Sequence, residues 1–350
     1  SRRRDPLTFD VQSLRVDTMV GVSAAAAAFT PLEATIGGAT LGVATANRMT
    51  IVGRILGHSG ILRGLVQGDH SPWRYVFLGG MAAGSLAAST LIPGSLVPLP
   101  DAFPMSRALT AGLLVGVGSS MGNGCTSGHG ICGNSRLSPR SMVYTATFMA
   151  SGAATASLSG VTSALGIAGL PTSMAVVLPP SDVLSRGLMV LLGSLVIGLA
   201  SWFAGSKLTG KANKAVQLVT EAASGALFAW GLAFSGMTKS SKVASFLAVT
   251  DPCFDPTLMF VMGGAILVNL PVFQAIIHKK VFPAKPVCGT EYQMPKNNAI
   301  DKKLILGGVL FGAGWGVGGL CPGPAICNFA VNPLNPLYLA FMAAMLMGMA

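Results

Sequence analysis

Two glycine-rich stretches with cysteines carry the chemistry that this sequence offers, one over residues 122–133 and one over residues 318–328. Their thiols and single histidine are Cys125, His129, Cys132, Cys321 and Cys327. A thiol is a weak hydrogen-bond donor and sulfur is polarizable, so these side chains suit passing contacts with a soft anion such as thiosulfate or hydrosulfide. Neither core holds Lys or Arg, which argues against a permanent ion-pair trap.

We expect both stretches to line a path for a small solute, with exposed backbone N–H groups stabilising its negative charge. The expected substrate-binding residues are Cys125, Cys321, Gly122, Gly124, Ser127, Gly128, His129, Cys132, Gly319, Pro322, Gly323 and Cys327. The main rival hypothesis is a zinc or copper(I) site at Cys125, His129 and Cys132. His129 is equally well explained as a hydrogen-bonded structural histidine, and Cys132 and Cys327 as packed thiols. We expect no metal and no cofactor.

The elements that must position these stretches are membrane helices. The chain has 350 residues, 51% of them hydrophobic and only 10% charged, whereas a soluble domain carries about 25% charged residues. The apolar residues form runs of about 20, the length of a spanning helix. The 45 glycines favour close helix packing in a bilayer. The net charge of +11 lies at segment ends and in loops, so it indicates topology rather than nucleic-acid binding.

The expected fold is an all-α polytopic membrane protein. Nine spanning segments are predicted, at residues 33–53, 73–96, 105–124, 139–166, 183–205, 215–237, 256–278, 303–321 and 336–350. Glycines and prolines predict that both cysteine stretches are non-helical re-entrant loops, which are tolerated at membrane depth only where protein or water covers them. Glu33 and Glu221 are interpreted as carboxylates at the starts of two matching spans, where they favour a helix N-terminus.

The two halves of the chain resemble each other. Gly112, Gly116, Gly118, Gly122 and Cys125 recur 196 residues later as glycines and Cys321. A weaker match relates residues 42 and 53 to residues 225 and 236. Four spans precede the fifth and four follow it, so the second half begins on the opposite membrane face. This predicts two inverted four-helix repeats, which are typical of transporters with a substrate site near the midplane.

Basic residues set the expected orientation. With the N-terminus outside and the C-terminus inside, the cytoplasmic loops hold 15 of the 23 Lys and Arg residues, as the positive-inside rule prefers. We expect an N-terminal segment (1–32), a first repeat (33–166), a linking transmembrane helix (167–213) and a second repeat (214–350). The expected location is the plasma membrane.

The motifs also resemble a known family. Residues 122–133, followed by Leu-Ser-Pro-Arg-Ser at 137–141, are similar to the signature of the YeeE/YedE sulfur-transport family. Residues 236–238, 260–264 and 312–325 resemble its second half, which is a separate polypeptide in some bacterial pairs, so the chain resembles a fusion of the two.

The resemblance implies uptake of thiosulfate or a related species past cysteines that line a narrow path, with Cys125 and Cys321 matching the family's loop cysteines. Thiosulfate importers of the family carry a further cysteine in the first span, where this chain has Asn47 to Thr50. Sulfide or another small sulfur anion therefore stays open. The expected partners are the anion, the bilayer and a cytoplasmic sulfur-accepting protein, with no nucleic acid. A membrane sulfurtransferase or redox protein that uses a cysteine persulfide is the alternative from the enzyme class. A sulfide or metal permease, and a scaffold subunit without a path of its own, also stay open.

Overall fold

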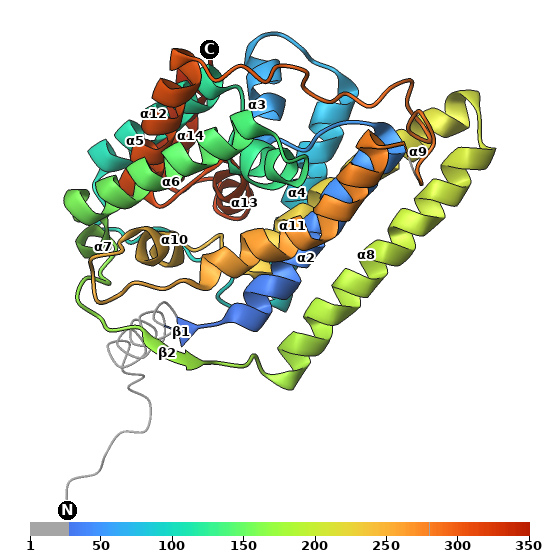
Figure 1. Cartoon of the computed structure of the whole chain (residues 1–350). Helices are drawn as coiled ribbons and strands as arrows, with labels where there is room; N and C mark the ends of the chain where they lie inside the picture. Colours follow the sequence, from blue (N-terminus) through green and yellow to red (C-terminus); the bar gives the residue numbers. More distant parts are fainter. Residues whose placement is uncertain (1–27, 280) are drawn as a thin grey trace, which may run out of the picture.

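The structure is a computed structural model that describes residues 28–279 and 281–350. Most of the expected N-terminal segment (1–32), including Arg2 to Arg4, lies outside the described residues. Figure 1 shows a bundle of long helices that surrounds several short ones, with the C-terminus at the end of the molecule opposite to β1.

Each of the nine predicted segments coincides with one long helix of the described chain. These helices are α2 (Pro31–Val52), α4 (Pro72–Leu91), α5 (Met105–Gly122), α6 (Pro139–Ser159), α8 (Ser181–Lys207), α9 (Gly210–Phe234), α11 (Thr257–Ile277), α12 (Lys302–Gly318) and α14 (Pro336–Met349). Among the described residues, length and composition alone mark three regions as long and apolar enough to cross a membrane: Ser181–Lys207, Thr257–Ile277 and Lys302–Val331. The number of nine spans therefore stays a prediction.

Short elements occupy several stretches that are predicted as loops. They are α3 (His58–Val66), the π-helix η1 (Thr126–Gly133), α10 (Ser240–Leu247) and α13 (Pro322–Val331). The predicted span 139–166 is broken at Gly160, so that its last part forms the separate short helix α7 (Val161–Ala164). A parallel pair of short strands, β1 (Ala28–Phe29) and β2 (Ser173–Val176), joins the start of α2 to the segment before α8. The expectation of an all-α fold is therefore correct except for this one pair.

The prediction that prolines break the second cysteine stretch is wrong. Residues 322–331 form the regular helix α13, in which Pro322 and Pro324 occupy the first turn. The first N–H groups of a helix have no intrahelical acceptor, so a proline there removes no hydrogen bond. The first stretch departs from α-geometry as expected, but it winds into π-helical turns over Thr126–Gly133, a form that often occurs at functional sites.

Glycines allow the long helices to pack closely. Helix α5 packs against α12 and α14, α6 packs against α12, and α2 packs against α9 and α11. A methyl group on Gly118 of α5 would meet Gly307 of α12, and one on Gly314 of α12 would meet Ala111 of α5. Gly118 and Ala111 of α5 correspond to Gly314 and Gly307 of α12 at the offset of 196 residues, so the two contacts are equivalent under the repeat. Small residues at such crossings bring helix backbones together, as membrane helices require.

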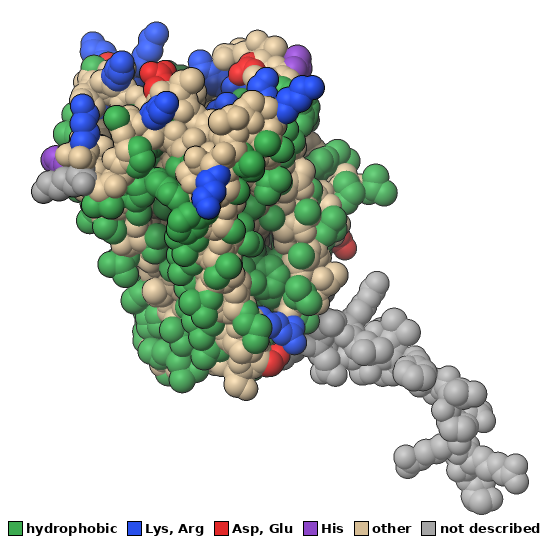
Figure 2. Space-filling view, turned by 90° about the vertical axis from the view of Figure 1, so that its right-hand side faces the viewer, with side chains coloured by type: hydrophobic (Ala, Val, Ile, Leu, Met, Phe, Trp, Pro, Cys, Tyr) green, Lys and Arg blue, Asp and Glu red, His purple; other side chains and the backbone are tan. Residues whose placement is uncertain are grey.

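Polar and apolar side chains are separated along the molecule. Figure 2 shows Lys and Arg gathered at one end, above a broad band of hydrophobic side chains. In Figure 1 this end holds α3 and the loop that precedes α12. Helix α8 runs along the edge of the bundle and exposes large apolar side chains, among them Leu192, Val196, Leu199 and Phe203. A band of this kind suits contact with lipid.

Candidate functional site

The two cysteine stretches share a backbone plan. Asn123 follows the last residue of α5 and adopts the left-handed conformation (φ 59°). Cys125 then has extended backbone geometry directly before η1. Gly319 follows the last residue of α12 and is also left-handed (φ 64°). Cys321 then has extended backbone geometry directly before α13. Each cysteine therefore occupies the residue just before a short helix, two residues after a left-handed turn.

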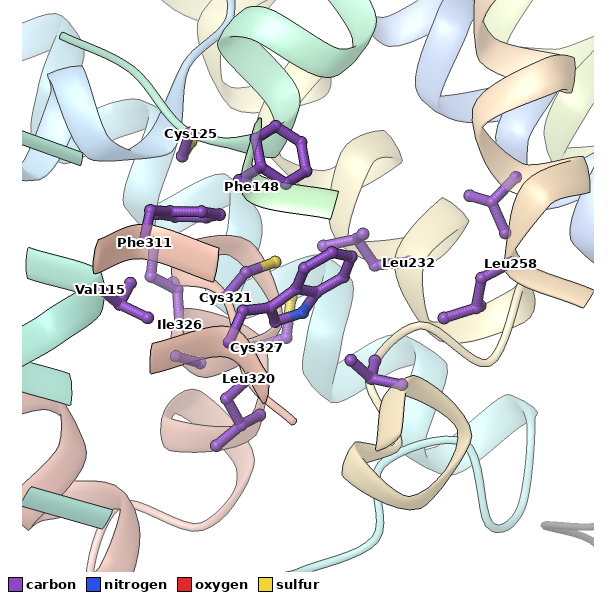
Figure 3. Close-up of a cluster of buried hydrophobic side chains, with 14 of the residues drawn as sticks. Val115, Cys125, Phe148, Leu232, Leu258, Phe311, Leu320, Cys321, Ile326 and Cys327 are labelled. Carbon is purple, nitrogen blue, oxygen red and sulfur yellow. The ribbon is translucent and has the colours of Figure 1, made fainter. Parts of the chain in front are cut away.

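The two stretches meet inside the protein. The Thr126 hydroxyl donates a hydrogen bond to Cys321 Sγ at 3.5 Å, and Cys125 Sγ lies 3.4 Å from Ser127 Oγ. Cys125 and Cys321 are 1% and 2% exposed. Figure 3 shows Cys125, Cys321 and Cys327 within one cluster of buried hydrophobic side chains. Segments almost 200 residues apart thus form one buried group of thiols and hydroxyls.

A cavity of about 50 Å³ lies beside this contact, and we call it the central cavity. Its polar lining comes from His58, Thr126, Ser127 and Cys321, and Gly323 adds backbone surface. The remaining lining is apolar and includes Leu41, Phe228, Leu232, Phe246, Val261 and Trp315. The central cavity is therefore a neutral, mostly apolar chamber with one thiol and two hydroxyls.

His58 belongs to this site although the sequence analysis did not single it out. Its Nδ1 lies 3.0 Å from Ser127 Oγ, and its ring packs against Phe228 at 4.6 Å between centroids. The side chain is buried, and Nε2 has no hydrogen-bond partner among the described residues. One feature of the sequence could have drawn attention to His58. The weak match between the halves aligns the stretch after Gly53, which contains His58, with the stretch after Gly236.

A second cavity of about 300 Å³ lies on the other side of the same backbone. We call it the arginine cavity, because its lining includes Arg48, Arg54, Arg74, Arg136 and Arg140. Gly57, Ser59 and Gly128 face this cavity, whereas the neighbouring His58 and Ser127 face the central one. Residues 57–59 and 126–128 therefore form a dividing wall one residue thick.

His129 lies at the rim of the arginine cavity with both ring nitrogens engaged. Nε2 lies 3.1 Å from Gly122 O, and Nδ1 lies 2.9 Å from Ser141 Oγ. Because a carbonyl accepts only, Nε2 carries the proton and Nδ1 accepts from the Ser141 hydroxyl. The ring also packs against Tyr144. This geometry fits the structural interpretation of His129, in which it ties η1 to α5 and α6.

The other predicted site residues divide between the cavities and the packed interior. Gly124 and Gly128 line the arginine cavity, and Ser127 and Gly323 line the central one. The remainder line neither cavity and are buried: Gly122, Cys125, Cys132, Gly319, Pro322 and Cys327. Cys132 Sγ donates to Leu56 O at 3.4 Å, away from His129. No group of three His, Cys, Asp or Glu residues suited to a metal ion occurs in the described part of the chain.

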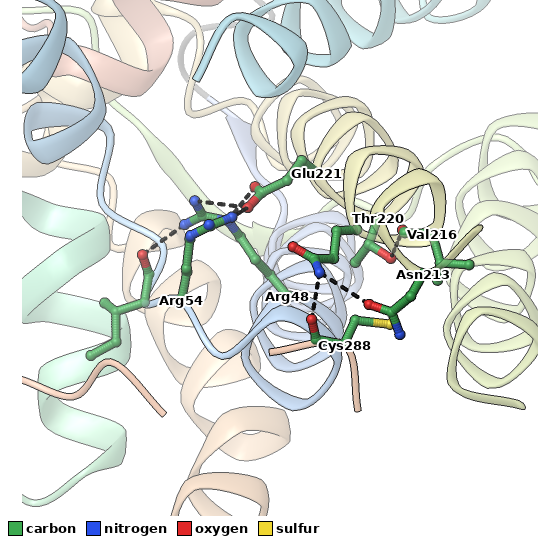
Figure 4. Close-up of polar contacts among 9 residues, drawn as sticks. Arg48, Arg54, Asn213, Val216, Thr220, Glu221 and Cys288 are labelled. Carbon is green, nitrogen blue, oxygen red and sulfur yellow. Dashed lines mark hydrogen bonds and ion pairs between the residues drawn. The ribbon is translucent and has the colours of Figure 1, made fainter. Parts of the chain in front are cut away.

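A buried ion cluster supports the dividing wall. Arg48 Nε donates to Glu221 Oε2 at 2.6 Å, and Arg54 Nη1 donates to Glu221 Oε1 at 2.9 Å (Figure 4). Arg48 also donates to Ile55 O at 2.7 Å, just before the wall. The interpretation of Glu221 as a residue at a helix start is wrong, because α9 begins three turns earlier at Gly210. Glu33 does lie in the first turn of α2.

Comparisons with known proteins cover both halves of the chain. A family model described as "Sulphur transport" matches residues 11–155. A second one, described as a family of unknown function (DUF6691), matches residues 216–350. The first match contains Cys125 and η1, and the second contains Cys321 and α13.

Several relatives from Xylella fastidiosa carry the description "Probable transporter". One from strain 9a5c is 39% identical over 127 residues, which are 36% of this chain and 83% of the relative. Another from strain Temecula1 is 44% identical over 126 residues, which are 36% of this chain and 93% of the relative. These matches, with the cysteine motifs and the apolar helices, identify an integral membrane protein that belongs to the sulphur-transport (YeeE/YedE) family.

Proposed function

We propose that the protein is a membrane transporter or channel that moves a small sulfur-containing anion through the central cavity. The observation that carries this proposal is the contact of Thr126 with Cys321 Sγ at 3.5 Å beside that cavity. A thiol and two hydroxyls offer weak hydrogen bonds to terminal sulfur or oxygen atoms. Weak contacts suit transport, because a solute must leave its site as well as enter it.

The size and polarity of the central cavity select small solutes. A volume of about 50 Å³ holds roughly three to five water-sized groups, since one needs about 10–15 Å³ on this measure. Its lining of Leu, Phe and Trp side chains disfavours strongly hydrated ions, which lose hydration free energy there. A hydrosulfide ion or the terminal sulfur of thiosulfate has the soft, weakly hydrated surface that such a chamber accepts.

We propose that Cys125 and Cys321 act in sequence along the path. Cys125 is in contact with Ser127 of the dividing wall, and Cys321 lines the central cavity. A solute that crosses the wall passes one thiol and then the other. The first span carries no cysteine and places Arg48 in a buried ion cluster instead. The selectivity of the proposed path between thiosulfate and sulfide therefore depends on Cys125, Cys321 and the arginine cavity.

The proposed topology is nine spans in two inverted repeats, 33–166 and 214–350, joined by a linking span in 167–213. The exchange of the contacts of Gly118 and Gly314 under a shift of 196 residues supports it, as does the common backbone plan of the cysteine stretches. The basic end in Figure 2 is the proposed cytoplasmic side of a plasma-membrane protein, with the N-terminus outside. A sulfur-accepting protein would take the solute on that side.

The decisive experiment is uptake of ³⁵S-labelled thiosulfate, sulfide and sulfate into cells that lack their own sulfur carriers. We expect Cys125→Ala and Cys321→Ala to lower uptake at least tenfold at equal membrane expression. Cys288→Ala is the matched control, because this buried thiol packs between α8 and α9 and should leave uptake at the wild-type level. Wild-type uptake in both loop variants would refute the proposal. Transfer of the outer sulfur of thiosulfate to a cysteine as a persulfide, with release of sulfite and no uptake, would favour a sulfurtransferase.

A further inference from the structure

The arginine cavity carries more positive charge than its own carboxylates neutralise. Glu221 pairs with Arg48 and Arg54, Asp69 pairs with Arg74, and Asp301 approaches Arg140 at 3.9 Å. Five guanidinium groups thus face three carboxylates, a surplus of two positive charges. Partly buried charge without a partner is costly, so the cavity favours an anion that supplies the missing negative charge.

Arg136 is the clearest unsatisfied donor in this lining. Its Nη1 donates to Pro295 O at 3.1 Å, whereas its buried Nε has no acceptor among the described residues. The described part of the chain gives Arg136 no ion pair. A guanidinium binds an oxyanion through parallel N–H groups, and Arg136 brings this unpaired guanidinium to the lining of the arginine cavity.

The N-terminus of α6 adds neutral donors to the same space. Ser138, Arg140 and Ser141 line the arginine cavity, and α6 starts at Pro139 without a side-chain cap. The first N–H groups of a helix have no intrahelical acceptors and lie at the positive end of its dipole. Together with the guanidinium of Arg136, which is unpaired among the described residues, these N–H groups favour an anion with several oxygen atoms.

The opposite side of the cavity is held in place before any ligand binds. The Trp73 ring contacts three guanidinium groups, with Arg48, Arg54 and Arg74 at 5.1, 4.7 and 4.5 Å from its centroid. Hydrogen bonds from Arg74 and Ser71 hold the pKa of Asp69 well below its usual range, so this carboxylate stays ionised and fixes Arg74. A lining that is ordered in advance loses little conformational entropy on binding.

We propose that the arginine cavity is a binding site for a doubly charged sulfur oxyanion, the class that shares an SO₃ group with thiosulfate, sulfite and sulfate. It lies one residue from the central cavity, across the dividing wall. An anion there contacts Arg136, Arg140 and the start of α6. The assignment of the transported solute to this class rests on the proposed function, whereas binding at this site does not.

The test is anion binding to the full chain in neutral-lipid nanodiscs, measured by calorimetry with sodium sulfate and sodium thiosulfate at constant ionic strength. We expect both to bind, with chloride at equal concentration giving no saturable heat. Arg136→Gln and Arg140→Gln should each weaken binding at least tenfold, and Arg136→Lys should weaken it less because it keeps the charge. Arg186→Gln is the control, since Arg186 is exposed in the first turns of α8 and pairs with Asp182.

Three results would overturn the proposal: equal affinity in the Gln variants and the wild type, a chloride response as strong as that of sulfate, or no saturable heat with sulfate in neutral lipid. Unfolding temperatures measured without anion identify variants that have lost their fold, and Arg136→Lys then remains as the informative variant. Cys321→Ala should bind sulfate with wild-type affinity. Loss of uptake in that variant with binding retained separates this site from the cysteine path.

Discussion

Replacement of Glu221 by Gln tests how much the buried ion cluster beside the dividing wall stabilises the folded protein. The substitution keeps the size of the side chain but removes the only carboxylate that pairs with Arg48 and Arg54 in the described part of the chain. Arg48 and Glu221 are 1% and 0% exposed, so bulk water compensates poorly for the lost partner. The remaining guanidinium groups then face each other without compensation.

The expected loss is large for a single substitution. Removal of one partner of a buried pair costs about 3–5 kcal/mol. With an unfolding entropy of about 2.1 cal/mol/K per residue, the 350 residues give about 0.7 kcal/mol/K, so Tm should fall by roughly 4–7 °C. All six cysteines are buried, and the reaction of a fluorogenic maleimide with them during heating therefore reports unfolding.

Asp182→Asn is the matched control, because it is also a carboxylate-to-amide change in an ion pair. Its partner Arg186 and Asp182 itself are 44% and 63% exposed, and such surface pairs contribute about 0–1 kcal/mol. We expect its Tm to stay within about 1 °C of the wild type. Arg54→Gln should cost less in the Glu221→Gln background than in the wild type, because it removes a charge left unpaired. Equal Tm values for Glu221→Gln and Asp182→Asn would refute the reasoning.

Two further substitutions test the helix packing and the central cavity. Gly314→Ala should destabilise the folded protein by about 1–3 kcal/mol, because the added methyl group would lie 2.8 Å from Ala111 O. Gly263→Ala is its control, because a methyl group there meets nothing within 4 Å. This control should be neutral or stabilise the protein by up to about 1 kcal/mol. Similar Tm values for the two variants would contradict this account. His58→Ala should lower sulfur-anion uptake about tenfold, the equivalent of one lost hydrogen bond of about 1.4 kcal/mol, because it removes the Ser127 partner and the unpaired Nε2; wild-type uptake would exclude His58 from the path.

The sequence predicts the long helices well because hydrophobic length is a local property. The segments 105–124 and 303–321 differ from α5 and α12 by only a few residues at their ends. Short helices carry no such signal. Pro322 and Pro324 indicated a broken helix, although they stand in the first turn of α13. Glycine content correctly predicted irregular geometry after Cys125, but it cannot distinguish a loop from π-helical turns.

The geometry of the candidate site was predictable where one stretch of sequence holds its residues. Cys125 and Cys321 stand in repeated motifs, and their equivalent backbone geometry follows from those motifs. His58 and the arginine cavity depend on contacts between distant segments, such as His58 with Ser127 and Arg136 with Pro295. Each arginine considered alone along the chain is interpreted as a topology signal. The fold brings five of them together in the lining of the arginine cavity.

Under the proposed function, the two cavities would divide two tasks that conflict at a single site. A charged lining attracts anions and raises their local concentration, but it also slows their release. The central cavity avoids that cost, because its polar groups are a thiol, two hydroxyls and the unpaired nitrogen of His58. The surplus charge lies across the dividing wall, one residue away, where Arg136 faces the larger cavity. If the protein transports an anion as proposed, a neutral chamber next to a cationic one would let the anion be drawn towards the basic end without being held at the thiols.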